Sequence, residues 1–176
     1  MGGPTGDRMI RVDMTNQTAS IEPYSEDWKL LGGRSLSARI LLSECDPTCD
    51  PLGPDNIFVV APGLLAGTSA PTSGRISVGG KSPLTGGIKE ANAGGNPGQH
   101  LMKLGFRAII VKGQPADPEK RYGLKVSADS AEVVEADDYK GLWNYACCEK
   151  LLADAPKTAS AISIGPAGEI DRKSVV

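Results

Sequence analysis

Residues 63–95 read GLLAGTSAPTSGRISVGGKSPLTGGIKEANAGG, and this stretch decides how the rest of the sequence is interpreted. It is rich in glycine, serine and threonine and carries few charged side chains. Glycine lets a backbone lie directly against a ligand and present its N–H groups as donors. The stretch therefore predicts a surface made largely of main chain, suited to a flat, polar organic molecule that bears phosphate.

The bulk composition is that of an ordinary soluble domain. The chain has 176 residues, of which 40% are hydrophobic and 23% charged, so one domain is expected. A net charge of −2 and few aromatic residues argue against a nucleic-acid partner. The apolar runs are too short to span a bilayer, and the N-terminus lacks the apolar core of a secretory signal. We therefore expect no membrane partner and a cytoplasmic location.

The metal-binding and nucleophilic residue types are few. Cys45, Cys49, Cys147 and Cys148 lack the spacing of a zinc ribbon or a cluster loop. We expect plain thiols in a reducing compartment; the alternative is a metal site at Cys45 and Cys49 that takes further ligands from outside. His100 is the single histidine, so no histidine-based constellation can be assembled and no catalytic residue is assigned.

Hydrophobic periodicity predicts more strands than helices. The predicted strands are two short ones within 9–23, then 57–61, 75–78, 107–113, a hairpin over 121–136 and a last strand at 160–165. The predicted helices are 25–44 with a break at Gly32 and Gly33, 96–104, and 137–152 in two pieces around Gly141. The hairpins imply mostly antiparallel pairing, so an α+β class is predicted and a doubly wound sheet is disfavoured.

Four motifs occur together along the chain: PLGPDN at 51–56, GTSAPTSGR at 67–75, KSPLTGG at 81–87 and EANAGG at 90–95. With them the chain resembles the N-terminal domain of tungsten-containing aldehyde:ferredoxin oxidoreductases, and the resemblance covers nearly all of it. It implies two mostly antiparallel β-sheets with a few flanking helices, forming a base for a pterin cofactor. It also implies a single domain over 1–176, without the C-terminal end of that domain and the later cluster-binding domains.

The resemblance further implies a cofactor and a reaction. A tungsten (or molybdenum) bis-pyranopterin would lie over this domain, with Mg²⁺ bridging the pterin phosphates. A [4Fe–4S] cluster is expected only on a missing domain or on a partner. The reaction would oxidise aldehydes to carboxylic acids and pass electrons through the cluster to a ferredoxin-type carrier. The expected partners are therefore C-terminal domains or a partner subunit, and that carrier. A homo-oligomer is also expected, because a lone domain would expose the apolar face that its partner covers.

The family's cofactor-binding residues map onto the glycine-rich stretch. Arg75 matches the pterin-contacting arginine, whose guanidinium suits a phosphate or a polar pterin edge. Asn92 matches the asparagine whose backbone carbonyl helps to hold Mg²⁺. The other implied contacts are the backbones of Ala93, Gly94 and Gly95, and the charge of Lys81. Structural alternatives stay open: Arg75 as a strand-edge ion pair, Asn92 as a turn residue and Lys81 as a solvated lysine.

Two other functions remain open at this point. The chain could be a stand-alone, non-catalytic truncated domain that serves as a structural, assembly or self-associating partner. It could also be a nucleotide- or sugar-phosphate-binding module that uses the same glycine-rich cradle.

Overall fold

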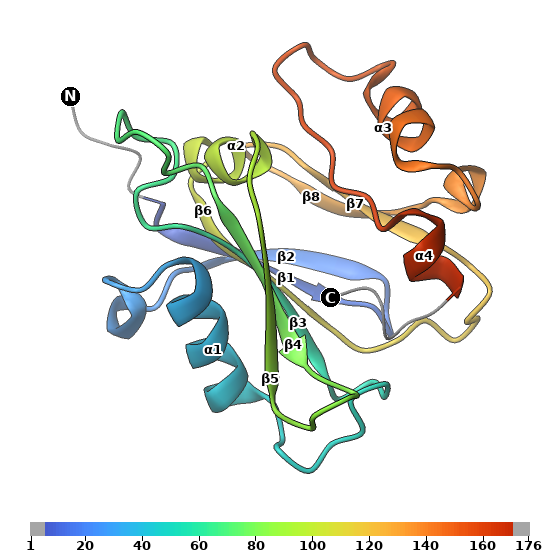
Figure 1. Cartoon of the computed structure of the whole chain (residues 1–176), viewed down its shortest axis with the longest axis horizontal. Coiled ribbons are helices and arrows are strands. Elements are labelled where there is room, and N and C mark those ends of the chain that lie inside the picture. Colours follow the sequence, from blue (N-terminus) through green and yellow to red (C-terminus); the bar gives the residue numbers. More distant parts are fainter. Residues whose placement is uncertain (1–5, 171–176) are drawn as a thin grey trace.

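The computed structural model describes residues 6–170, which form a six-stranded sheet, a separate two-stranded sheet and flanking helices (Figure 1). This arrangement confirms the predicted α+β class with two mostly antiparallel sheets. In chain order the elements are β1 (Arg8–Asp13), β2 (Thr18–Pro23), the 3-10 turn η1 (Glu26–Trp28), α1 (Gly33–Glu44), β3 (Ile57–Pro62), β4 (Ile76–Lys81), β5 (Ile88–Ala93), α2 (Pro97–Lys103), β6 (Phe106–Lys112), β7 (Tyr122–Val126), β8 (Ala131–Glu135), η2 (Asp137–Tyr139), α3 (Asn144–Leu152) and α4 (Gly165–Ile170).

The large sheet has the strand order β2-β1-β6-β3-β4-β5. All its neighbouring strands are antiparallel except β1 and β6, which run parallel. Strands β3 and β6 lie at its centre, and both are nearly continuous apolar runs, IFVVAP and FRAIIVK. A strand that is covered on both faces needs apolar side chains on both sides, which explains these two runs.

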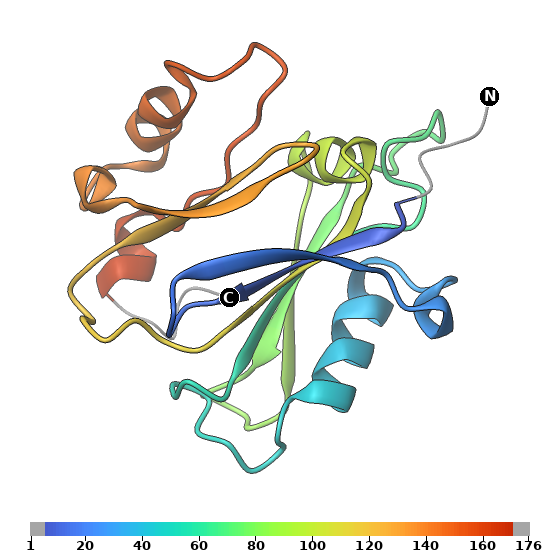
Figure 2. The same cartoon turned by 180° about the vertical axis from the view of Figure 1, so that it is seen from behind.

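Different elements cover the two faces of the sheet, as the two opposite views show (Figures 1 and 2). Helix α1 packs its Leu36, Ile40 and Leu41 side chains against β3 and its neighbours. On the other face, the β7–β8 hairpin packs against a second cluster centred on Ile10 and Phe106. Among the helices of residues 6–170, none has the length and apolar character needed to cross a membrane.

Small residues allow α1 to lie close to the sheet. A Cβ built on Gly79 of β4 would lie 3.0 Å from Ser37 Cβ of α1. Ser77 lies two residues before Gly79 on β4. The buried hydroxyls of Ser37 and Ser77 are 3.1 Å apart and hydrogen-bond to each other. At the start of the helix, a Cβ on Gly32 would lie 2.9 Å from Leu64 Cα. Glycine and serine thus set the distance between the helix and the sheet.

Two strand predictions differ from the structure. Strand β5 was not predicted, because KEANA carries no β-branched or aromatic residue; it is a strand because its backbone pairs with β4. The strand predicted at 160–165 is wrong. Ile162 and Ile164 alternate as in a strand but are 59% and 55% exposed, and within the described chain the segment pairs with no strand before α4 begins. Alternation without a neighbouring strand does not make a sheet.

The contact at Gly32 yields a stability test. The φ of Gly32 is −162°, which any residue adopts, so Gly32→Ala introduces a steric conflict with the Leu64 backbone and no backbone strain. Overpacking of this kind costs about 1–3 kcal/mol, and we expect a loss of that size in urea unfolding. Gly87→Ala is the matched control, since its Cβ would meet Thr85 Oγ1 at 3.7 Å, an ordinary contact. Equal unfolding midpoints for the two variants would contradict the close approach.

Candidate functional site

The second half of the glycine-rich stretch forms the β4–β5 edge of the large sheet. The antiparallel register pairs Ile76 with Ala93, so Arg75 and Gly94 stand beside each other at the end of the ladder. A Cβ built on Gly94 would lie 3.8 Å from Arg75 Nη1. Arg75 and residues 92–96 are exposed, so this edge is an open surface of side-chain-poor backbone with one guanidinium on it.

The guanidinium of Arg75 is oriented by Asn92. Its Nε donates a hydrogen bond to Asn92 Oδ1, and its Nη2 donates a longer one of 3.4 Å to the Asn92 backbone carbonyl. Within residues 6–170, Nη1 makes no hydrogen bond, so its donors are available to a ligand. An oriented fork with spare donors is suited to an anion such as a phosphate or carboxylate.

Two further side chains extend this contact. Asn92 Nδ2 donates to Glu90 Oε1 at 3.3 Å, and Arg34 Nε of α1 donates to Glu90 Oε2 at 3.1 Å. We call Arg34, Glu90, Asn92 and Arg75 the edge network. Glu90 and Asn92 share one face of β5 because side chains alternate along a strand. Neither Arg34 nor Glu90 was predicted as a site residue; the spacing of two residues between Glu90 and Asn92 was the available local signal.

Glu90 is the covered member of the edge network, since its side chain is only 13% exposed whereas that of Arg34 is 75% exposed. Burial raises the pKa of Glu90, but hydrogen bonds from Ser77 and Asn92 and the charge of Arg34 outweigh burial and hold the pKa below its ordinary value of 4.5. Glu90 is therefore ionised at neutral pH. Its carboxylate neutralises one cation and fixes the amide that orients the other.

The backbone after Asn92 is shaped by glycine. Gly95 has a φ of +100°, which side-chain-bearing residues rarely adopt, and it turns the chain from β5 into α2. Gly98 of α2 is buried, and a Cβ there would lie 3.2 Å from the carbonyl oxygen of Arg75. Helix α2 therefore packs directly against the backbone that carries Arg75.

Lys81 lies apart from this surface. It ends β4, and at roughly 3.3 Å per residue the strand places it about 20 Å from Arg75. Its ammonium donates to the backbone carbonyls of Pro47, at 2.6 Å, and Cys49. The structure thus brings Arg75, Asn92 and residues 93–95 together, and it gives Lys81 a bonding role in the loop after α1.

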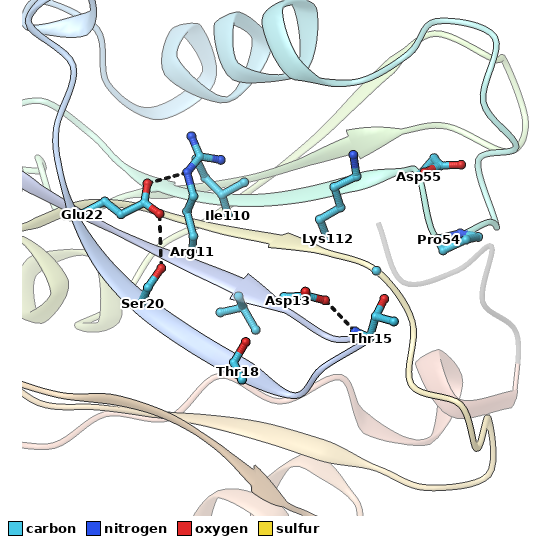
Figure 3. A pocket seen from close by; sticks show the side chains of 12 residues that line it. Arg11, Asp13, Thr15, Thr18, Ser20, Glu22, Pro54, Asp55, Ile110 and Lys112 are labelled. Carbon is cyan, nitrogen blue, oxygen red and sulfur yellow. Dashed lines mark hydrogen bonds and ion pairs between the residues drawn. The ribbon is translucent and has the colours of Figure 1, made fainter.

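A separate open hollow of about 480 Å³ lies between β1, β2 and the end of β6 (Figure 3). Its main cation, Arg11, is bound by both oxygens of Glu44 at 2.6 and 2.8 Å and by Glu22 at 2.8 Å. The hydrogen bonds that Arg11 donates to Glu44 raise the pKa of Arg11 well above its usual range, despite partial burial. The charge of this arginine is therefore already matched by two carboxylates, whereas the other lysine or arginine of the lining, Lys112, is exposed at the end of β6.

The sequence of the chain is similar to a known protein family. Residues 9–174 match the family model described as "Aldehyde ferredoxin oxidoreductase, N-terminal domain". The tungsten-containing aldehyde ferredoxin oxidoreductases of Thermococcus kodakarensis and Pyrococcus furiosus are each 41% identical to the chain over 168 residues. That alignment covers 92% of this chain and 27% of each relative, so the chain spans about a quarter of their length.

Two more distant relatives are also similar. An "Aliphatic sulfonate oxidoreductase, WOR-like subunit" of Pyrococcus furiosus is 28% identical over 180 residues, which covers 92% of this chain and 28% of that protein. Among solved structures, the active site complex BamBC of benzoyl coenzyme A reductase, in complex with 1,5-dienoyl-CoA, superposes with a TM-score of 0.80 at 27% identity. The superposition covers 88% of this chain and 23% of that one.

The ionisation of Glu90 tests the edge network. In an NMR titration of the folded chain, we expect the Glu90 carboxyl to titrate below 4.5, and Arg34→Ala to raise its pKa by removing the neighbouring positive charge. Since its pKa is lowered by folding, the ionised carboxylate stabilises the fold above about pH 4.5, and this contribution is lost as the pH falls through the folded pKa.

Lys89→Ala is the matched control for this titration, because Lys89 is the neighbouring residue of β5 and points to the opposite face of the sheet. An unchanged Glu90 pKa in Arg34→Ala, or an equal change in both variants, would contradict the proposed network.

Proposed function

The chain belongs to the family of aldehyde ferredoxin oxidoreductase N-terminal domains, and we propose that it forms the pterin-binding base of a tungsten-dependent oxidoreductase that converts aldehydes to carboxylic acids. The observation that carries the proposal is the exposed Arg75 guanidinium, oriented by Asn92 beside the bare backbone of Gly94 and Gly95. A [4Fe–4S] cluster on further domains or on a partner subunit would pass electrons to a ferredoxin-type carrier.

The residues at this edge fit a phosphate-bearing cofactor. Arg75 keeps Nη1 donors for an anion, and the exposed Gly94 beside it presents backbone with no side chain. The backbone carbonyl oxygen of Asn92 accepts one long hydrogen bond from Arg75 Nη2 and has a second lone pair. A carbonyl oxygen is a ligand that Mg²⁺ accepts. We therefore assign Arg75 and the backbone of residues 92–95 to binding the cofactor and its bridging Mg²⁺.

The tungsten (or molybdenum) bis-pyranopterin, when bound, supplies the two-electron redox chemistry. The residues of this chain position it: Arg75 binds an anionic group, and Glu90 keeps Asn92, and through it Arg75, in place. Positioning by groups fixed in advance lowers the cost of ordering on binding. No catalytic residue of the chain is assigned.

The proposed enzyme needs domains beyond this one. We propose that the chain works as one domain over 1–176, joined to C-terminal domains or to a partner subunit of the same family. Large apolar side chains stand exposed at the start of α3, with Trp143 at 77% and Tyr145 at 88%. Such side chains are typical of a surface that another protein surface covers. The same observation favours the second candidate function, a non-catalytic domain that self-associates.

The cofactor assignment is tested by producing the full chain anaerobically together with C-terminal domains of the family. We expect the complex to hold tungsten or molybdenum, to release fluorescent pterin on denaturation, and to oxidise aldehydes with a viologen acceptor. Arg75→Ala should weaken binding of the cofactor roughly ten- to a hundredfold and lower metal and pterin retention, because a charge-assisted hydrogen bond contributes roughly 1.5–3 kcal/mol. Lys125→Ala, which removes an exposed cation on the β7–β8 hairpin, is the charge control.

The possible results separate the hypotheses. Metal and pterin at background in a folded wild-type complex would exclude a cofactor role for the domain and favour the self-associating one. Retention in Arg75→Ala equal to that in Lys125→Ala would remove Arg75 from the site while leaving the family function intact.

Lys81 provides a contrasting variant. Because its ammonium bonds to the Pro47 and Cys49 carbonyls, Lys81→Met should lower the free energy of unfolding by about 1–3 kcal/mol and leave cofactor retention per folded complex unchanged. Urea unfolding and metal analysis of the same samples measure both quantities. A loss of cofactor with unchanged stability would instead place Lys81 at the cofactor, as the family resemblance implies.

A further inference from the structure

The loop after α1 brings two cysteines into contact. Cys45 ends the helix as its C-cap, and Cys49 follows within the motif CDPTC. Their sulfur atoms are 3.7 Å apart, which is a direct contact between two thiols. Both side chains are half-buried, so a small molecule in solution can reach them.

The turn between the two cysteines is held by several independent contacts. The backbone N–H of Cys49 donates to the Asp46 carbonyl at 3.1 Å. Asp46 Oδ1 accepts two hydrogen bonds of 2.7 Å from the backbone N–H and the hydroxyl of Thr48. Lys81 reaches in from β4 and bonds to the Cys49 carbonyl. The proximity of the two sulfurs is therefore imposed by the fold of the loop.

The described residues do not by themselves complete a metal site at this pair. Within residues 6–170, no three His, Cys, Asp or Glu side chains are grouped as metal ligands, and two thiolates alone make an incomplete zinc or iron site. Packing explains Cys45, which lies against the core under α1, but it does not explain a second thiol in contact with it.

We propose that Cys45 and Cys49 form a reversible disulfide, with a small-molecule disulfide such as oxidised glutathione as the oxidant. One cysteine thiolate attacks the S–S bond of the oxidant, which gives a mixed disulfide and releases one glutathione thiolate. The other cysteine attacks the mixed disulfide, the Cys45–Cys49 bond forms, and the second glutathione leaves. Two electrons pass to the oxidant, and the two cysteine protons are taken up by the released thiolates.

The required movement is small. The sulfurs must approach from 3.7 Å to about 2.05 Å, a shift that side-chain rotation and the turn at 46–48 can share. Partial burial and the adjacent Cys45 thiol raise the pKa of Cys49 above its ordinary value, although the charge of Lys81 opposes this. Little Cys49 thiolate is present at neutral pH, so oxidation should become faster as the pH rises.

Equilibration of the full, reduced chain with glutathione buffers tests the proposal without any bound cofactor. After acid quenching and alkylation, peptide mass spectrometry should find a Cys45–Cys49 link with the loss of two hydrogen masses. The dependence on the glutathione ratio should give an effective concentration on the order of millimolar or more for the two thiols. Cys49→Ser should abolish the link and leave glutathione on Cys45, and Cys45→Ala should leave it on Cys49.

The pair Cys147 and Cys148 is the internal control, and a Cys147→Ser, Cys148→Ser double variant should form the same link as the wild type. The proposal would be overturned if excess oxidised glutathione left the wild type reduced, produced mixed disulfides only, or linked Cys147 or Cys148 in place of the Cys45–Cys49 pair. Circular dichroism of each sample shows that the chain is folded, so a negative result cannot be assigned to unfolding.

Discussion

Helix α1 lies close to the sheet where β4 has no side chain, at Gly79. A Cβ at that position would already be 3.0 Å from Ser37, and the buried hydroxyls of Ser37 and Ser77 fill the remaining space by bonding to each other. Ser37 Oγ also bonds to the Gly33 and Arg34 carbonyls, so the polar atoms of this close contact are all satisfied. This contact sets the height of the helix above β4 and β5, and hence the reach of the side chains on its first turn.

The edge network depends on that height. Arg34 leaves the first turn of α1 and reaches Glu90 on β5, Glu90 holds the Asn92 amide, and Asn92 holds the guanidinium of Arg75. Each link joins residues on regular elements or directly beside them, so the exposed guanidinium stands on a rigid support. A binding group whose orientation is fixed in advance loses less entropy when a ligand arrives. The family membership and this geometry thus support the same proposed use of the edge.

The glycine-rich stretch has two physical roles that its composition does not separate. Gly94 and Gly95 are exposed beside Arg75, where a missing side chain leaves room for a ligand. Gly79 is buried, where a missing side chain lets helix α1 approach the strand. Two of the three cations of the stretch differ in the same way, since Arg75 is exposed at the edge and Lys81 is bonded to the loop that carries Cys45 and Cys49.

The sequence by itself determined the α+β class, the central strands, the β7–β8 hairpin and the helices near 33–44, 97–103 and 144–152. Each of these has a local signal, either a continuous apolar run, an alternating pair around a turn or helical spacing. Its motifs also indicated the family, which the match over residues 9–174 confirms. Only the tertiary structure decided that residues 88–93 form a strand and that 160–165 do not, and which side chains meet Arg75. Strand pairing and register depend on contacts between segments that are distant in the sequence. Asn92 of β5 reaches Arg75 because it pairs with Ser77 of the neighbouring strand β4, and no local sequence pattern specifies that register.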